Sequence, residues 1–131
     1  MRRVLLDTNV LIRAVQGGLN AIKPAARAVL SDVETERILS AVSITEIVIK
    51  TNARKLSIYK VDLAQIVDDL QLTILPFTAR HAMRLYDLPL HHQDPFDRML
   101  IATALAEGIP LMSADDNFPS YTDAGLNLIR S

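Results

Sequence analysis

Short apolar segments alternate with segments of helical periodicity along the whole chain, and this order limits the possible folds more than any other feature. We expect strands at residues 3–6, 38–42, 72–75, 109–112 and 126–129. We expect helices at residues 9–15, 24–33, 43–55, 62–70, 78–86 and 95–107. Because no hairpin signal joins one strand to the next, the strands should run parallel with helices on both faces. The sequence therefore predicts an α/β fold, a three-layer α/β/α sandwich around a central parallel sheet of about five strands.

Length and composition fit a single domain at residues 1–131, since a chain of 131 residues that is 50% hydrophobic can close one substantial core. The chain has no cysteine, which excludes disulfides, cysteine-ligated zinc and thiol nucleophiles. Asp7, Asn9 and Arg13 interrupt the apolar start of the chain before it could act as an export signal. No stretch approaches the roughly 20 apolar residues that span a bilayer. We expect a cytoplasmic protein without membrane contact.

Acidic side chains occur where the expected strands end. Asp7 ends the first strand, and Glu46 lies in the first turn of the helix after the second strand. Asp97 lies in the first turn of the last expected helix, and Asp115 follows the fourth strand. Because ligands of open parallel sheets bind beyond the carboxyl ends of the strands, we expect these four carboxylates to gather at one edge.

Gathered carboxylates repel one another unless a cation holds them together. Mg²⁺ suits such a site, because it is a hard ion that takes oxygen ligands and keeps several waters. A metal-activated water would then be the nucleophile, so no side-chain nucleophile is required. This agrees with a chain that has neither cysteine nor a Gly-x-Ser-x-Gly elbow. We predict a metal site formed by Asp7, Glu46, Asp97 and Asp115.

Some of these acids also have purely structural interpretations. Glu46 would complete a capping box with Ser43 at the start of its helix. Asp94 is a good N-cap for the last helix, so we expect it to be an accessory residue and not a ligand. The turn after the fourth strand contains both Asp115 and Asp116, which are alternative ligands. Because all four acids are expected at one edge of the sheet, a shared metal site explains them better than four separate structural roles.

Four short motifs surround these acids. Residues 5–9 read Leu-Leu-Asp-Thr-Asn, and residues 43–50 contain Ser-x-x-Glu-Ile-x-Ile-Lys. Residues 92–102 contain His-x-Asp-Pro-Phe-Asp-Arg-x-Leu-Ile-Ala, and residues 113–115 contain Ser-x-Asp after a strand. The chain here resembles the PIN-domain family, specifically the VapC-like ribonuclease toxins of type II toxin–antitoxin pairs. The motifs follow the family order and span nearly the whole chain, and the Asp-Pro-Phe-Asp-Arg block is the most specific.

The resemblance implies a five-stranded parallel sheet, Mg²⁺ or Mn²⁺ ions and endoribonuclease activity on RNA. It also implies a cognate antitoxin protein that blocks the site and, usually, a homodimer. Val48, Ile49 and Ile58 are candidates for the apolar surface under the antitoxin, with the core as the alternative. The chain departs from the family at Thr45, where tryptophan is common, and at residues 54–56, which read Arg-Lys-Leu in place of Gly-Lys-Leu. Neither departure touches a proposed ligand, so both bear on the subgroup and not on the chemistry.

Polar residues beside the four acids are candidates for accessory roles. Thr8 and Ser113 would hydrogen-bond to a metal ligand or a phosphate, and Asn9 would orient Asp7. For Thr8, capping of the first helix is an equally good alternative.

Basic residues would have to supply local phosphate contacts, because the net charge of −1 is not typical of a nucleic-acid binder. Lys50, Arg54 and Lys55 form an acid-free segment that is a candidate RNA contact, with a solvated helix face as the alternative. Arg98 would clamp a phosphate or, alternatively, pair with a nearby acid such as Asp94.

Two other functions fit parts of the sequence. A catalytically inactive PIN-type module would bind partners without cleaving RNA, and the complete set of acids argues against it. A phosphoacceptor receiver domain also places acids at strand ends. It requires an aspartate at the end of the third strand, where this chain has Leu75, Pro76 and Phe77. We therefore expect a metal-dependent endoribonuclease.

Overall fold

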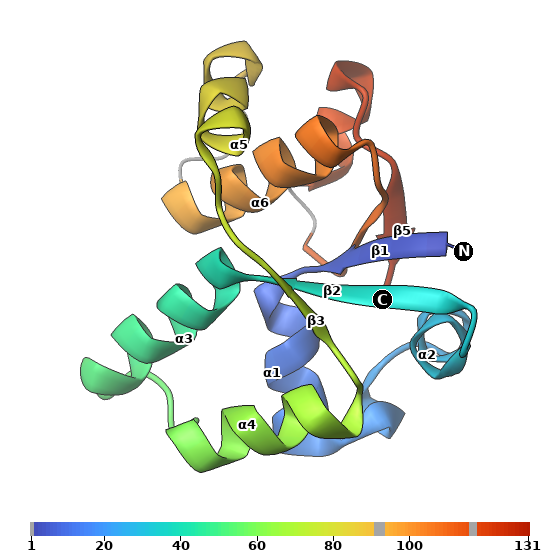
Figure 1. Ribbon diagram of the computed structural model, residues 1–131, viewed down its shortest axis with the longest axis vertical. Coiled ribbons are helices and arrows are strands. Elements are labelled where there is room, and N and C mark those ends of the chain that lie inside the picture. The colour runs from blue at the N-terminus through green and yellow to red at the C-terminus, as the bar shows by residue number, and fades with distance from the viewer. Residues whose placement is uncertain (1, 91–93, 116–117) are drawn as a thin grey trace.

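The computed structural model describes residues 2–90, 94–115 and 118–131 and is built around one sheet of five parallel strands (Figure 1). The strands are β1 (Arg2–Leu6), β2 (Thr35–Ser40), β3 (Thr73–Leu75), β4 (Leu111–Ser113) and β5 (Leu128–Arg130). Their order in the sheet is β3-β2-β1-β4-β5, and all four pairings are parallel. The predicted parallel sheet of about five strands is confirmed, and β1 lies at its centre.

Helices cover both faces of this sheet, which makes the predicted three-layer sandwich (Figure 1). In the described residues the α-helices are α1 (Thr8–Gly17), α2 (Pro24–Ser31), α3 (Ala41–Asn52), α4 (Lys60–Asp69), α5 (Ala79–Met83) and α6 (Pro95–Glu107). Short 3₁₀ turns are η1 (Leu19–Ala21), η2 (Arg84–Asp87) and η3 (Phe118–Ala124). Helices α1, α2 and α4 lie on one side of the strands, and α5 and α6 lie on the other. None of the helices described is long and apolar enough to cross a membrane.

The sheet separates two hydrophobic cores. Val4 and Leu6 of β1 pack into the core beneath α1, α2 and α4, while Leu5 between them packs into the core beneath α6. Side chains alternate along a strand, so a central strand covered on both faces needs apolar residues at every position. This is why the first strand appears in the sequence as an unbroken apolar run that ends at the first acid.

The junction of β2 and α3 lies earlier than the sequence predicted. We expected a strand at 38–42 and a helix from Ser43, but β2 ends at Ser40 and α3 begins at Ala41. The Ser40 hydroxyl accepts a hydrogen bond from the backbone N–H of Val42 at 3.0 Å, so Ser40 is the N-cap. The N-cap Ser40 and the helix-forming residue Ala41 together outweigh the β-propensity of Val42. The capping-box interpretation of Glu46 is therefore wrong, because Glu46 lies in the second turn of the helix.

The last helix begins and ends as its sequence predicts. The Asp94 carboxylate accepts hydrogen bonds from the backbone N–H groups of Phe96 and Asp97, and Pro95 is the first helical residue. Gly108 ends the helix with φ 66°, in the left-handed region that favours glycine. Helix α6 therefore presents its first turn, with Asp97, to the same edge of the sheet at which β1 ends.

Candidate metal centre at the carboxyl edge of the sheet

Asp7 is the most deeply buried acid of the candidate site. It follows β1 directly, and its backbone N–H donates to the Met112 carbonyl at 2.9 Å, which fixes it against the neighbouring strand β4. Its side chain has no exposed surface. Oδ2 accepts a hydrogen bond from the Ser113 hydroxyl at 2.8 Å, whereas Oδ1 is buried without a hydrogen-bond partner among the described residues. A buried carboxylate oxygen in this state is costly unless a cation or a proton satisfies it.

The surroundings of Asp7 disfavour its negative charge. The pKa of Asp7 is raised to about 6 from its ordinary value of 3.8, mainly by burial and to a smaller extent by the nearby charges of Asp115 and Glu46. The Ser113 hydroxyl and the backbone N–H of Thr8 act in the opposite direction. Three carboxylates from β1, α3 and the loop after β4 thus interact at this edge. Carboxylates whose charges interact in this way favour a positive charge beside them.

Glu46 is the second acid with an unsatisfied buried oxygen. Its side chain extends from α3 and is almost fully buried. Oε2 accepts a hydrogen bond from the Lys50 ammonium at 2.6 Å, while Oε1 is buried without a hydrogen-bond partner in the described part of the chain. Lys50 is one helical turn further along α3. In the sequence only the i, i+4 spacing indicates this pairing, and the contact of Lys50 with RNA stays a prediction.

Ser113 and Arg130 hold the backbone of Asp115. The Ser113 hydroxyl, which donates to Asp7, also accepts from the backbone N–H of Asp115 at 3.0 Å. Arg130 of β5 donates from Nη1 to the Asp115 carbonyl at 2.9 Å and from Nη2 to the Ala114 carbonyl at 3.4 Å. We did not predict Arg130. The one available signal was a basic residue ending the strand beside an acidic turn. Asp116, the alternative to Asp115, lies outside the described residues.

Asp97 is buried in the first turn of α6, next to the N-cap Asp94. The hydrogen bond that Lys50 donates to Glu46 is the main cause that raises the pKa of Lys50, and the charges of Asp94 and Asp97 act in the same direction. Helices α3 and α6 also contact one another. The first turn of α6 therefore lies near Lys50 and Glu46. Asp94 has the capping role expected of it.

The four predicted ligands border one edge but do not form a ready-made cluster. Among the described side chains, no three acidic or histidine residues are placed to hold one metal ion together. The two unsatisfied oxygens, Oδ1 of Asp7 and Oε1 of Glu46, nevertheless fit a hard cation that takes oxygen ligands. The ligand set of Asp7, Glu46, Asp97 and Asp115 stays a prediction.

Thr8 connects the start of α1 to α3. Its hydroxyl donates to the Ser43 hydroxyl at 2.8 Å, and both side chains are buried. The alternative that Thr8 caps α1 is wrong, because Asp7 occupies the N-cap position, where its side chain makes no capping hydrogen bond. Thr8 thereby fixes the helix that carries Glu46 relative to Asp7. Asn9 is exposed, and its role in orienting Asp7 stays a prediction.

The basic residues that are predicted to contact RNA lie in different surroundings. Arg98 donates from Nη1 to the Pro89 carbonyl at 2.9 Å and to the Tyr121 hydroxyl at 3.4 Å, which links the segment before α6 to η3. Arg54 and Lys55 are exposed just beyond the end of α3. Both are placed where a polyanion can reach them, and their RNA contact stays a prediction.

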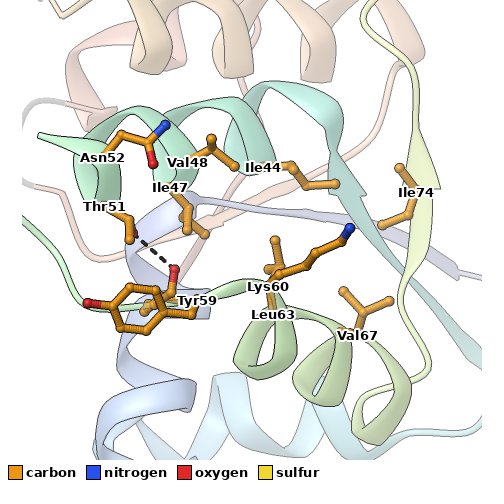
Figure 2. A pocket seen from close by; sticks show the side chains of 12 residues that line it. Ile44, Ile47, Val48, Thr51, Asn52, Tyr59, Lys60, Leu63, Val67 and Ile74 are labelled. Atoms are coloured by element: carbon orange, nitrogen blue, oxygen red, sulfur yellow. Dashed lines mark hydrogen bonds between the residues drawn. The ribbon is translucent and has the colours of Figure 1, made fainter.

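An apolar groove of about 570 Å³ opens between α3, α4 and β3 (Figure 2). Val48 and Ile58, two of the candidate antitoxin contacts, line it, and Ile49 is exposed on the same helix as Val48. The other lining residues are Ile44, Ile47, Thr51, Asn52, Tyr59, Lys60, Leu63, Ala64, Val67 and Ile74. Helix α3 thus contributes both a wall of the groove and Glu46 of the acidic edge.

The sequence matches the model of the PIN domain family over residues 4–124. The chain belongs to the PIN domain family. This membership excludes the receiver-domain alternative and agrees with the sheet order and the three layers. A search of curated proteins gave no match.

Solved structures share this PIN fold at low sequence identity. A chain of the VapBC2 structure from Rickettsia felis, bound to a DNA fragment from the promoter, is 15% identical, with 98% of each chain covered and a TM-score of 0.69. A chain of VapBC-5 from Mycobacterium tuberculosis, a member of the VapBC family of toxin–antitoxin systems, is 20% identical, with both chains covered in full and a TM-score of 0.62. A chain of FitAcB from Neisseria gonorrhoeae is 19% identical, with 96% of each chain covered and a TM-score of 0.60.

Proposed function

We propose that this PIN domain is a metal-dependent endoribonuclease and the toxin of a toxin–antitoxin pair. PIN domains are generally nucleases, which supports the reaction class. The likeness to VapBC and FitAcB chains supports the toxin role. The observation that carries the proposal is Asp7, a fully buried carboxylate at the end of the central strand with an unsatisfied oxygen and a raised pKa.

The residues that would hold Mg²⁺, or Mn²⁺ in its place, are Asp7, Glu46, Asp97 and Asp115. A bound divalent ion would supply acidity to an attacking water and positive charge for the phosphodiester. Asp7 would be the most rigid ligand, because its backbone is bonded to β4 and its Oδ2 to Ser113. Ser113 also holds the backbone of Asp115, so one hydroxyl positions two of the proposed ligands.

The apolar groove supports an antitoxin as the protein partner. Val48, Leu63 and Ile74 place apolar side chains from three elements around it (Figure 2). A peptide segment with apolar side chains on one face would fit such a groove. An arginine from the same segment would reach the acidic edge along α3 and pair bidentately with the carboxylates. A homodimer, which the family resemblance implies, is compatible with this arrangement.

An RNA cleavage assay tests the reaction. We expect the purified chain to cleave single-stranded RNA with Mg²⁺ or Mn²⁺ and to be inactive with a chelator. Asp97→Asn should abolish cleavage while keeping the fold, whereas the exposed Asp123→Asn should behave as the parent chain. Full activity in chelator would contradict the metal mechanism. A folded chain that binds its antitoxin but never cleaves RNA would instead support the inactive binding module.

A further inference from the structure

Lys50 and Glu46 form an ion pair with an unusual distribution of burial. A glutamate and a lysine four residues apart are ordinary neighbours on an exposed helix face. Here the Glu46 side chain is only 4% exposed, while the Lys50 side chain is 37% exposed, and Nζ lies 2.6 Å from Oε2. The buried partner is a proposed metal ligand, and the cation reaches it from the solvent side.

The ammonium of Lys50 also experiences the other acids of the edge. Asp94, the N-cap of α6, and Asp97, in the first turn of α6, lie close enough for their charges to attract this ammonium. Glu46 Oε1 has no hydrogen-bond partner among the described residues, so the carboxylate has one oxygen committed to Lys50 and one open. Lys50 thus supplies a single positive charge where a divalent ion would supply two.

A lysine and a divalent ion on one carboxylate oppose each other. If Glu46 held a divalent ion, that ion would compete with the Lys50 ammonium for the negative charge of the same carboxylate. The two cations would also repel each other, because partly buried charges are weakly screened. The lysine would therefore lower the affinity of the site for metal.

We propose that Lys50 is a built-in counter-cation of Glu46 that competes with the divalent ion, so that metal loading draws the Lys50 ammonium away from Glu46. This inference rests on the proposed function, since it assumes that Glu46 is a metal ligand. Lys50 stabilises the metal-free protein by neutralising a buried carboxylate and sets a higher metal threshold for activity. Once released, its ammonium lies at the border of the acidic edge, where a phosphate of the substrate can accept from it.

The test measures Mn²⁺ binding directly, from the electron paramagnetic resonance signal of free Mn²⁺ in titrations without RNA. Lys50→Met keeps the length of the side chain and removes its charge, so we expect Mn²⁺ to bind on the order of tenfold more tightly. Lys50→Arg keeps the charge and should bind like the parent chain or more weakly. Lys55→Met makes the same change of net charge at an exposed position and should bind like the parent chain.

Thermal melting provides a second readout that separates competition from simple damage. Lys50→Met should melt below the parent chain in chelator, because Glu46 loses its partner, and should gain more from Mn²⁺ than the parent chain does. Circular dichroism confirms that each variant is folded, and if Lys50→Met does not fold, Lys50→Gln takes its place.

The outcomes distinguish this inference from the proposed function. Equal Mn²⁺ affinity in the parent chain and in Lys50→Met would overturn the counter-cation role and leave the metal site intact. The same rise in affinity in Lys55→Met would also overturn it, since net charge alone would then explain the effect. If neither the parent chain nor Lys50→Met binds Mn²⁺, both the inference and the metal site are wrong. Binding by Lys50→Met alone would support the inference most strongly.

Discussion

The hydroxyl of Ser113 donates a hydrogen bond to Oδ2 of Asp7 at 2.8 Å, across 106 residues of sequence. Asp7 directly follows β1 and Ser113 ends the neighbouring parallel strand β4, so the register of the sheet brings them together. Since Ser113 also accepts from the backbone N–H of Asp115, a single hydroxyl connects two acids of the candidate site.

Ser113→Ala should weaken both the fold and the site. It leaves Oδ2 of a fully buried Asp7 without its partner, which typically costs about 1–3 kcal/mol in the free energy of unfolding. We expect RNA cleavage to fall by about 10- to 100-fold, as for other residues that orient a metal ligand. Urea unfolding and a cleavage assay measure the two effects, with the exposed Ser57→Ala as the control. Parent-like values in both assays would show that Ser113 does not position Asp7.

Asp7→Asn should abolish cleavage and stabilise the metal-free protein at neutral pH. The pKa of Asp7 is raised to about 6 in the fold from an ordinary 3.8, so protonation favours the folded state. Its contribution to stability is complete below about pH 4 and is lost as the pH rises through 6, which amounts to roughly 2–3 kcal/mol. Asparagine has no such pH dependence.

Melting curves in chelator between pH 4 and pH 8 test whether the stabilisation by Asp7→Asn increases with pH. The advantage of Asp7→Asn should be small at the acidic end and largest above pH 6. Asp123→Asn, at an exposed position of η3, is the matched control and should follow the parent chain at every pH. If Asp7→Asn is less stable than the parent chain at pH 8, the buried charge of Asp7 does not destabilise the fold.

Val48→Glu should prevent antitoxin binding and leave cleavage intact. Val48 lines the apolar groove with 46% of its surface exposed, so a charge there opposes an apolar partner without disturbing the core. Val33→Glu makes the same change at a position that is 84% exposed and lies outside the groove lining. We expect co-purification with the antitoxin to fail for Val48→Glu and to persist for Val33→Glu. Undiminished binding by Val48→Glu would place the antitoxin on another surface.

Glu107, the last residue of α6, should change the stability of the protein with pH in the opposite direction to Asp7. The Thr78 backbone N–H donates to His81 Nδ1, so His81 donates from Nε2 to Glu107 at 3.0 Å. This bond is the main cause that lowers the pKa of Glu107, with Arg80 as the next cause. The stability that Glu107 provides is therefore present above about pH 4.5 and is lost as the pH falls.

Glu107→Gln should accordingly destabilise the protein by about 1–3 kcal/mol at pH 7, because a largely buried pairing is broken. The difference from the parent chain should shrink below pH 4. Glu34→Gln, at an exposed residue before β2, serves as the control in the same denaturation series. A difference that grows toward acid pH would contradict the assigned role of Glu107.

The sequence predicted the secondary structure best where a single local signal applied. The unbroken apolar run before Asp7 predicted the central strand, and Asp94 with Pro95 predicted the start of α6. At the start of α3 the Ser-x-x-Glu spacing predicted that the helix begins at Ser43, whereas Ser40 is the N-cap. The strand ends earlier because Ile38 and Leu39 already fill the two faces of the sheet before the chain turns.

The connections between side chains were beyond the reach of sequence patterns. The i, i+4 spacing allows Lys50 to reach Glu46, but the sequence does not show that the Glu46 side chain is buried while Lys50 stays partly exposed. Arg130 acts on Asp115 through strand pairing between β4 and β5, which no spacing in the sequence encodes. The positions of the acids at strand ends were predictable, whereas their partners depend on tertiary register.

The unsatisfied oxygen of Asp7 has an evolutionary consequence. Most single substitutions destabilise a protein, whereas replacing this aspartate is expected to stabilise the metal-free protein. In a lineage where cleavage no longer brings a benefit, drift and selection for abundance would then act in the same direction. We expect silent descendants of such a gene to lose the first acid early and to keep the sheet around it, because inactivation there carries no penalty in folding.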